Sequence, residues 1–444
     1  MKNNSVSLML ISVVTAGAVC LGVLTETVLG ASSAEPAEEP EPQAVQRERG
    51  SIYDRRGVLL AGSSEGERYY PEALCPNILG TLSSDGSAQS GIELALDSEL
   101  RRGDVYLSID SRLQRTAEDI LRTAAAQYEK GVSYDTAAPY CGSAGAVVIL
   151  SCRSGEVLAC ASYPDYRLDS FPQDFASLSA DESSPLLDRA LQGLYRPGSP
   201  FKAVTAAAAL CEGVISPETS FYCGARLRLG GTDFSCVRSH GYTNVSRALE
   251  LSCNIFFYRT ALLLGIERLD RYARLFGYGQ APLCELPTLG GQLASPDSSE
   301  YWGDGQLIQA AIGQSSMLCT PMQMALEALT VADRGRQLSP TFIRYGGIHE
   351  PVSVLRADRV FELITKAMTA SSAYTYGDYA LSQLEHPCAV KTGTPQSPRG
   401  YDSAVIGFYP ADRPEIAFAV MLEGGANAKH AVYELCKAFE DNKE

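Results

Sequence analysis

The chain is poor in basic residues and in histidine. It has 37 lysines and arginines against 52 aspartates and glutamates, a formal net charge of −15 at pH 7, and only four histidines. No basic stripe is present to neutralise phosphates, which argues against nucleic-acid binding, and the negative charge does not suit an anionic lipid surface. The scattered histidines provide no Ser-His-Asp motif. Repeats of solenoid period are also absent, and the length of 444 residues predicts one large domain and a smaller one.

A serine and a lysine lie one helical turn apart where the sequence predicts the start of a helix. Pro197-Gly198 interrupts the preceding chain, and the alanine-rich run 203–210 propagates a helix that Gly213 ends. Because residues i and i+3 share a helix face, Lys202 can reach the Ser199 hydroxyl. Burial beside another cation would lower the pKa of Lys202 and let it accept the hydroxyl proton. Alone, this pattern is more often a serine cap before a solvated lysine.

Two polar motifs follow further along the chain. Ser252 and Asn254 stand directly before a strongly apolar run, so a polar pair lies against a core. Residues 391–394, Lys-Thr-Gly-Thr, read as the end of a strand whose cation, hydroxyls and N–H groups suit a carboxylate. Gly393 would permit a ligand to approach the backbone closely. Each motif alone is better explained as a cap or a strand end, but the three together make those separate explanations improbable.

The three motifs together resemble those of the penicillin-binding protein and serine β-lactamase superfamily, where a Ser-x-x-Lys, a Ser-x-Asn and a Lys-Thr-Gly element occur in this order. Further segments resemble the class B penicillin-binding proteins, which are monofunctional transpeptidases. They are an N-terminal signature at 49–61, the first hairpin of the catalytic domain at 145–159, and a segment before the last motif at 313–325. The resemblance extends from about residue 49 to about residue 425.

The strand pattern and the resemblance predict an α+β fold, with an antiparallel sheet flanked by helices and a helical subdomain. Predicted strands at 146–150 and 157–161 form the first hairpin of the catalytic domain, and strands at 404–408 and 416–422 end it. We expect four parts: a transmembrane anchor over 1–30, an acidic proline-rich linker over 31–45, a short N-terminal pedestal over 46–104 and a transpeptidase domain over 105–444.

The N-terminal stretch predicts a membrane location. Residues 5–24 are uncharged and long enough to cross a bilayer, with Lys2 before them and Glu26 after them. A cleaved signal peptide is the alternative, because the small residues within 29–34 suit a peptidase. The length of the apolar run favours the retained anchor. Both alternatives place the rest outside the cytoplasm, so we expect a single-pass membrane protein with an extracytoplasmic catalytic domain.

The resemblance implies the catalytic roles. Ser199 would attack the penultimate D-Ala of a stem peptide, and Lys202 would accept its proton. Ser252 would pass a proton to the leaving amine with help from Lys391, while Asn254 would hold Lys202 and the substrate amide. A second stem's amine would then attack the acyl-enzyme and cross-link two glycan strands in cell-wall synthesis. β-Lactams would acylate the same serine.

The resemblance also implies a substrate-binding strand and an oxyanion hole. Thr392 and Thr394, on either side of Gly393, would bind the terminal carboxylate, and the N–H groups of Ser199 and Thr394 would form the oxyanion hole. Two departures from the family pattern occur. Pro200 replaces the usual Thr or Ser after the nucleophile, and the strand at 403–408 lacks the aromatic residue that many relatives have before it.

No cofactor is expected, and the implied ligands are stem peptides and β-lactams. No region has room for a glycosyltransferase module, so the resemblance implies a SEDS-family glycan polymerase as partner, in cell division or in cell-shape maintenance. One alternative is a serine β-lactamase or D,D-carboxypeptidase, which passes the acyl group to water. Another is a non-catalytic penicillin-binding sensor or scaffold, against which the five intact catalytic residues argue.

Twelve of the thirteen cysteines lie beyond the predicted anchor. Cys223 and Cys236 flank a predicted hairpin and resemble a pair found in some class B relatives, which implies a disulfide, unless the organism lives without oxygen and leaves the thiols reduced. With His240 they match part of a zinc pattern, but we find no fourth ligand and predict no metal site. Cys253, inside the second motif, is expected to be a small buried apolar residue.

Overall fold

The computed structural model describes residues 48–132, 138–298, 302–345, 351–398 and 400–442. They belong to one unit that spans Arg47–Glu444. The predicted anchor and linker lie outside the described residues. Among the helices that are described, none combines the length and the apolar character that crossing a membrane requires.

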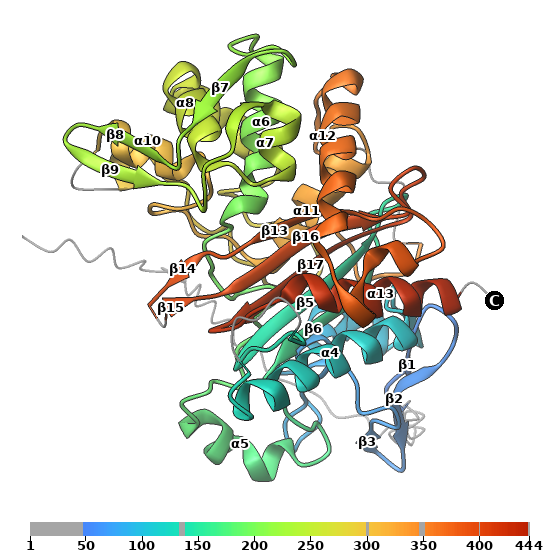
Figure 1. The fold of residues 1–444 in the computed structure, drawn as a ribbon. Coiled ribbons are helices and arrows are strands. Elements are labelled where there is room, and N and C mark those ends of the chain that lie inside the picture. Colours follow the sequence, from blue (N-terminus) through green and yellow to red (C-terminus); the bar gives the residue numbers. More distant parts are fainter. Residues whose placement is uncertain (1–47, 133–137, 299–301, 346–350, 399, 443–444) are drawn as a thin grey trace, which may run out of the picture. The chain divides into compact units, whose positions relative to one another are not determined.

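A five-stranded antiparallel sheet forms the centre of this unit and joins the start of the predicted transpeptidase domain to its end (Figure 1). The four strands predicted from the sequence are all present, and the strand of the Lys-Thr-Gly motif lies at one edge of the sheet. In sheet order the strands are β13 (Ala389–Gly393), β16 (Ser403–Tyr409), β17 (Ile416–Glu423), β5 (Ala144–Ser151) and β6 (Val157–Tyr163).

Both faces of the sheet are covered, because successive side chains of a strand point to opposite faces. In β5, Val148 and Leu150 belong to one apolar cluster, whereas Val147 and Ile149 belong to the other. Two amphipathic helices, α4 (Ser111–Glu129) and α13 (Ala428–Asp441), pack on the second cluster. The buried helix α11 (Pro321–Ala332) contributes to the first and begins with a capping box between Thr320 and Gln323.

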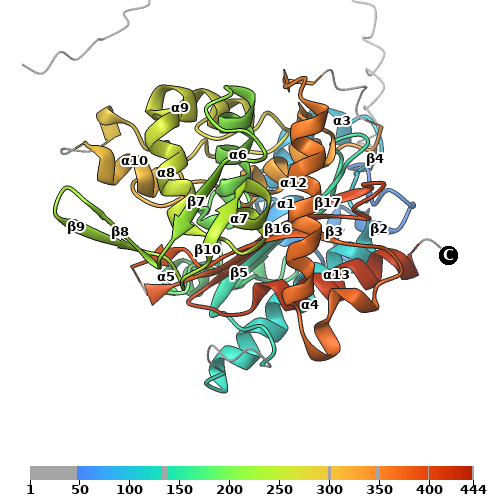
Figure 2. The same ribbon diagram turned by 45° about the horizontal axis from the view of Figure 1, so that its top comes forward.

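A helical subdomain lies on the side of the sheet opposite α4 and α13 (Figures 1 and 2). Its central helix, α6, is alanine-rich and buried nearly all round, which allows neighbouring helices to approach it closely. Two hairpin-like pairs, β7 with β10 and β8 with β9, extend from this subdomain. The elements are α6 (Lys202–Cys211), β7 (Ser220–Cys223), β8 (Arg226–Leu229), β9 (Thr232–Ser235), β10 (Gly241–Asn244), α7 (Val245–Glu250), α8 (Asn254–Leu264), α9 (Ile266–Leu275), α10 (Asp304–Ala310) and α12 (Asp358–Ser371).

The N-terminal segment forms a small four-stranded sheet with three short helices. Its strand order is β3-β2-β1-β4, and β4, which begins the predicted transpeptidase domain, pairs in parallel with β1. The apolar cluster of this segment is continuous with the core beneath the main sheet. The elements are β1 (Ile52–Tyr53), β2 (Leu59–Ser64), β3 (Glu67–Tyr69), α1 (Pro76–Leu79), α2 (Gly91–Ala95), α3 (Asp97–Leu100) and β4 (Val105–Tyr106).

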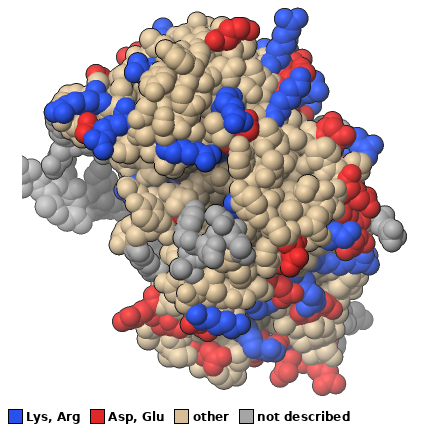
Figure 3. Space-filling view, in the orientation of Figure 1, with Lys and Arg blue, Asp and Glu red and all other residues tan. Residues whose placement is uncertain are grey.

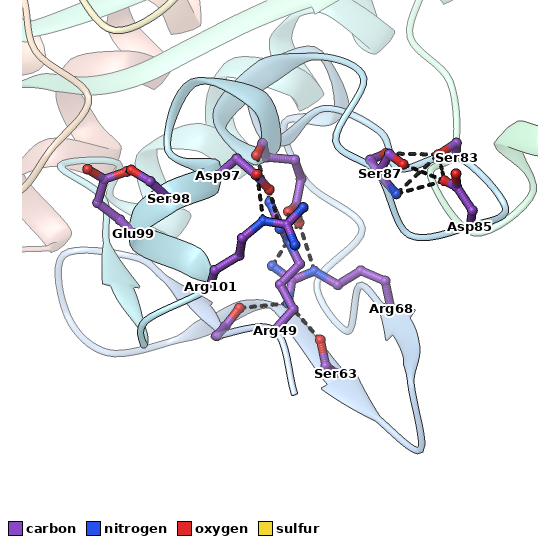
Figure 4. Close-up of polar contacts among 12 residues, drawn as sticks. Arg49, Ser63, Arg68, Ser83, Asp85, Ser87, Asp97, Ser98, Glu99 and Arg101 are labelled. Atoms are coloured by element: carbon purple, nitrogen blue, oxygen red, sulfur yellow. Dashed lines mark hydrogen bonds and ion pairs between the residues drawn. The ribbon is translucent and has the colours of Figure 1, made fainter. Parts of the chain in front are cut away.

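Two arginines of the N-terminal segment, Arg49 and Arg68, are paired with one buried acid, Glu93. Arg49 Nε lies 2.5 Å from a carboxylate oxygen of Glu93, and Arg68 lies 2.7 Å from the other oxygen. Asp97 bridges Arg49 and Arg101 on the surface of the same segment (Figure 4). Glu93 is fully buried, so the two guanidinium groups are what compensates its charge.

The remaining short elements connect these parts. Helix α5 has no buried residue and lies at the surface. These elements are α5 (Phe171–Ala180), the 3-10 turns η1 (Ser199–Phe201), η2 (Pro296–Ser298), η3 (Ser372–Tyr374), η4 (Gly377–Tyr379) and η5 (Leu381–Gln383), and the strands β11 (Arg336–Gln337), β12 (Ser353–Val354), β14 (Gln396–Ser397) and β15 (Gly400–Tyr401).

Candidate active site

Ser199 lies in the 3-10 turn η1, which runs directly into α6, so the predicted helix start is confirmed. The turn is held from outside by a pair of glycines. The N–H of Gly198 donates to the carbonyl of Gly313 at 2.8 Å, and a Cβ added at Gly313 would lie 2.2 Å from the Gly198 carbonyl oxygen. Only glycine permits this approach, which fixes the backbone immediately before the half-buried Ser199.

Lys202, the first residue of α6, is completely buried and is held by the second motif. Its Nζ donates to Asn254 Oδ1 at 2.6 Å, to the Ser252 carbonyl at 2.8 Å and to Ser252 Oγ at 3.0 Å. Among the hydrogen bonds of the described residues, none joins Lys202 to the Ser199 hydroxyl one turn away. Burial lowers the pKa of Lys202 to about 8, although the nearby thiols of Cys236 and Cys253 raise it.

Ser252 connects the three motifs. Its hydroxyl lies 3.0 Å from Lys202 Nζ and 3.0 Å from Lys391 Nζ. Its backbone has a φ of +55°, a region in which residues other than glycine are uncommon. Such strain is typical of functional sites, where surrounding contacts hold a residue in an unfavourable conformation.

Asn254 begins α8 two residues after Ser252, and both ends of its amide are engaged. Its Oδ1 accepts from Lys202, and its Nδ2 donates to the Ser235 carbonyl at the end of β9. An amide nitrogen carries two hydrogens, so one N–H of Asn254 is left for a further acceptor. The side chain is half-buried, so a ligand can reach it.

Lys391 on β13 is buried, with 1% of its surface exposed, and donates to Ser252 Oγ and to the Thr392 carbonyl at 2.9 Å. Burial lowers its pKa well below the usual value, and the charge of Lys202 lowers it further, while Glu327 raises it. Two buried cations that share one hydroxyl favour loss of a proton from one of them. The site therefore holds a lysine that can be neutral near physiological pH and a second amine that can assist it.

Glu327 is a site component that the sequence analysis missed. It lies in the middle of α11, is fully buried, and accepts a hydrogen bond from the hydroxyl of Tyr278. Within the described residues its Oε1 has no hydrogen-bond partner. Burial raises its pKa to about 8, against the lowering effects of Tyr278 and Lys391. No local sequence signal identifies it, because a lone glutamate in a helix-forming run has the same pattern whether its carboxyl is buried or solvated.

Gly393 brings β13 against the turn that contains Ser199. A Cβ at Gly393 would lie 2.6 Å from Cδ of Pro200, so the predicted close approach is to a side chain of the protein itself. Pro200, which departs from the family pattern, thus packs beneath the strand of the third motif. Beyond this contact Thr392 is half-buried and Thr394 is exposed at the end of the strand.

Two cavities flank these residues. One of about 550 Å³ is lined by residues that include Phe234, Gln309 and Ser315, and another of about 370 Å³ is lined by residues that include Arg196 and Gln396. Figure 3 shows this face of the molecule hollowed between the helical subdomain and the sheet.

The implied disulfide is not formed, since Cys223 and Cys236 are both free thiols. These cysteines lie together with His240 and Cys253, and the ligand atoms of all four residues are within 4.8 Å of one another. Cys253 is completely buried, as expected. The fold therefore supplies the fourth potential metal ligand that the local spacing did not reveal, because this ligand belongs to the second motif.

Residues 145–438 match a protein family described as the penicillin binding protein transpeptidase domain. The chain belongs to this family, and the resemblance seen in the sequence is confirmed. A peptidoglycan D,D-transpeptidase MrdA from Acinetobacter baumannii is 29% identical over 428 residues, which cover 87% of this chain and 60% of the relative. The chain thus spans about 60% of the length of this curated relative.

Two solved structures are similar over nearly the whole chain. PBP2 of Pseudomonas aeruginosa in complex with WCK 5153 has a TM-score of 0.76 and 27% identity, covering 89% of this chain and 96% of that one. A structure described as the structural coordination of polymerization and crosslinking by a peptidoglycan synthase complex contains a second similar chain. Its TM-score is 0.76 and its identity 25%, and the match covers 88% of this chain and 89% of that one. The predicted α+β fold of the penicillin-binding proteins is confirmed.

Proposed function

We propose that this chain is a serine D,D-transpeptidase that cross-links peptidoglycan stem peptides through an acyl-enzyme on Ser199. The observation that supports this most strongly is the Ser252 hydroxyl, which lies 3.0 Å from each of two buried lysine amines. The three polar motifs are far apart in the chain, and the fold gathers them beside one exposed strand end. The activity named for the similar A. baumannii protein agrees with this proposal.

In the proposed acylation, Ser199 Oγ attacks the carbonyl of the penultimate D-Ala. Lys202 takes the hydroxyl proton, a role that suits its pKa of about 8. The N–H groups of Ser199 and Thr394 stabilise the negative oxygen of the tetrahedral intermediate. One such donor lowers the activation free energy by about 3 kcal/mol. Ser252, between Lys202 and Lys391, relays a proton to the amine of the terminal D-Ala, which leaves.

Substrate binding is assigned to β13 and to Asn254. Thr392 and Thr394 donate hydroxyl hydrogen bonds to the terminal carboxylate, and Gly393 keeps the strand close to the nucleophile. The remaining N–H of Asn254 donates to a substrate carbonyl. An amine of a second stem peptide then attacks the ester and restores the Ser199 hydroxyl. A β-lactam acylates Ser199 in the same way and blocks this second step.

Further proposals concern organisation and location. We propose a membrane anchor over 1–30, a linker over 31–45, a pedestal over 46–104 and a transpeptidase domain over 105–444, with the catalytic part outside the cytoplasm. A separate glycan polymerase is the proposed partner, and a SEDS-family protein is our candidate. The similar chain in a peptidoglycan synthase complex agrees with such a partnership.

Labelling with a fluorescent penicillin tests the proposed acyl-enzyme. The purified full-length chain is compared with Ser199→Ala, and the labelled band is followed for hours after excess penicillin is removed. We expect stable labelling of the wild type alone. Absence of label on the wild type would exclude the acyl-enzyme, and rapid loss of the label would identify a hydrolase.

A further inference from the structure

Helix α11 packs on the face of the central sheet from which Lys391 projects. Ala389 and Lys391 are two residues apart in β13, so their side chains share a face of the sheet. Ala389 and Ile406, the cross-strand neighbour of Lys391, belong to the apolar cluster to which α11 contributes. Lys391 is 1% exposed, and Glu327 in the middle of α11 is fully buried. A buried amine and a buried carboxyl therefore lie on the same side of the sheet.

The carboxyl of Glu327 is fixed next to the turn that carries the nucleophile. It accepts a hydrogen bond from the hydroxyl of Tyr278, which is also fully buried. The ring of Tyr278 meets the ring of Phe201 edge to face, with 5.3 Å between the ring centroids. Phe201 ends η1 and directly precedes Lys202. Glu327 is thus connected through one hydrogen bond and one ring contact to the segment that runs from Ser199 to Lys202.

Glu327 and Lys391 influence each other's protonation. Burial raises the pKa of Glu327 to about 8, while the hydrogen bond from Tyr278 and the charge of Lys391 lower it. Burial and the charge of Lys202 lower the pKa of Lys391, and Glu327 raises it. Burial also raises the pKa of the Cys319 thiol just before α11, and Glu327 raises it further. Charges interact more strongly in an apolar interior than in water, so the coupling between the carboxyl and the amine needs no direct contact.

Within the described part of the chain, the other elements packed against α11 direct their charged groups elsewhere. Strands β5, β16 and β17 contribute apolar side chains to the shared cluster, and Glu423, at the end of β17, pairs with Arg189. The charged residues of α12 are exposed. On β11, Arg336 is exposed and pairs with Asp333. Lys391 is therefore the cation on which the charge of Glu327 acts.

Glu327 acts on one of the two lysines that share Ser252 and not on the other. Lys202 Nζ and Lys391 Nζ both lie 3.0 Å from Ser252 Oγ, and the proposed mechanism needs the proton on Lys391 and a neutral Lys202. The shift in the pKa of Lys202 comes from burial and from two nearby thiols. The ratio of this productive arrangement to the reverse one changes tenfold for each unit that separates the two lysine pKa values. A negative charge on Glu327 therefore favours the productive arrangement.

We propose that Glu327 is a positioning residue whose negative charge, once formed, keeps the proton on Lys391 while Lys202 is neutral. The charge forms as the pH passes the raised pKa of Glu327, about 8, and Lys202 loses its proton in the same range. Ser252 Oγ then lies between an ammonium group and a free amine. This role rests on the proposed acylation of Ser199, whereas the coupling between Glu327 and Lys391 does not.

The coupling is measured first, by NMR titration of the full-length chain with ¹³C-labelled lysine. The Lys391 signal is assigned by its loss in Lys391→Arg. We expect Glu327→Gln to lower the pKa of Lys391 by about one unit, because an opposite charge is removed. Glu327→Asp, which keeps a carboxyl, should retain most of the wild-type value. The matched control is Glu118→Gln, which changes a buried carboxyl on α4, over the other face of the sheet, and should leave Lys391 unchanged. An unchanged Lys391 titration in Glu327→Gln would overturn the proposal.

Acylation by a chromogenic β-lactam is then followed as a function of pH. Wild type and Glu327→Gln should react at similar rates below about pH 7, where Glu327 is mostly neutral. Above about pH 8 the variant should be slower by about tenfold, and Glu327→Asp should recover much of the rate. A deficit of the same size at every pH would indicate a structural role and overturn the positioning role. A wild type that shows the coupling by NMR but never acylates would refute the proposed function and leave the coupling standing.

Discussion

At the scale of single residues, the site is organised around one hydroxyl shared by two buried amines. Ser252 Oγ is 3.0 Å from both Lys202 Nζ and Lys391 Nζ, and burial lowers the pKa of each lysine. Keeping two ammonium groups out of water is costly, so the arrangement favours a neutral Lys202 that can accept a proton. The same two lysines would be ordinary cations on a surface.

The rate of Ser199 acylation should therefore depend on the protonation of Lys202. We expect the rate to rise with pH through about 8, because the neutral amine accumulates as pH passes the lowered pKa. Lys202→Arg retains a cation that cannot lose its proton and should be slower by about 100-fold or more. Stopped-flow acylation by a chromogenic β-lactam measures both. A profile without a rise before pH 10 would contradict this role.

Glu327 should make stability depend on pH. Burial raises its pKa from 4.5 to about 8, so the folded protein binds a proton that the unfolded chain releases above pH 4.5. The contribution of Glu327 to the free energy of unfolding is fully present below pH 4.5. It is lost as pH rises towards 8, at about 1 kcal/mol per pH unit. Glu327→Gln has no carboxyl to ionise, so its free energy of unfolding should increase relative to that of the wild type as pH rises from 4.5 to 8. Urea unfolding at several pH values tests it, and a constant difference between the two proteins would contradict it.

The sequence could predict which polar residues make up the proposed relay, because motifs with fixed spacing carry them. It could not predict Glu327, since nothing in a local pattern tells a buried carboxyl from a solvated one. Cys253 was correctly expected to be buried, but its place beside Cys223, Cys236 and His240 depends on how two hairpin-like pairs fold over α8. Local spacing contains no information about that contact.

At the scale of elements, the contact between the edge strand β13 and the turn η1 brings the third motif beside Ser199. The sequence predicted both, together with four strands of the sheet, because alternation and turn residues are local signals. The pairing of β7 with β10 around the β8–β9 pair was not predicted, since it joins strands separated by another hairpin. The glycine at 393 was expected to make room for a ligand, whereas its neighbour is Pro200.

A pair of substitutions tests the contact between β13 and η1. Gly393→Ala would place a methyl group 2.6 Å from Pro200 Cδ and push the strand away from the nucleophile. Because small displacements in an active site can cost about 100-fold, we expect acylation to slow by roughly that factor. Pro200→Ala removes the ring, so the double variant should recover much of the rate. Wild-type acylation by Gly393→Ala, or no recovery in the double variant, would show that the contact is unimportant.

At the scale of the whole molecule, the N-terminal segment and the catalytic part share one apolar core. Strand β4 pairs with β1, and residues of both parts belong to the same cluster. The sequence predicts a boundary near residue 104, but it cannot predict the continuity of the core, because that depends on long-range packing. We therefore expect the described part of the chain to unfold in a single transition.

The buried ion pairs of Glu93 should stabilise the N-terminal segment. Glu93 is fully buried and lies within 2.7 Å of Arg68 and 2.5 Å of Arg49, so Glu93→Gln leaves two guanidinium groups without their shared anion. Breaking a buried ion pair costs about 3 to 5 kcal/mol. The matched control, Asp97→Asn, loses two partly exposed ion pairs, with Arg49 and Arg101, each worth below about 1 kcal/mol. Denaturant unfolding compares them, and equal stability of the two variants would contradict the assigned role of Glu93.

The central claim is that the acyl group on Ser199 passes to an amine. The most direct measurement follows D-Ala release and product formation when the full-length chain receives a glycan polymer whose stems end in D-Ala-D-Ala. We expect released D-Ala to be matched by new cross-links between stems, and Ser199→Ala to yield neither. Release of D-Ala matched by trimmed, uncrosslinked stems would show transfer to water and contradict the claim.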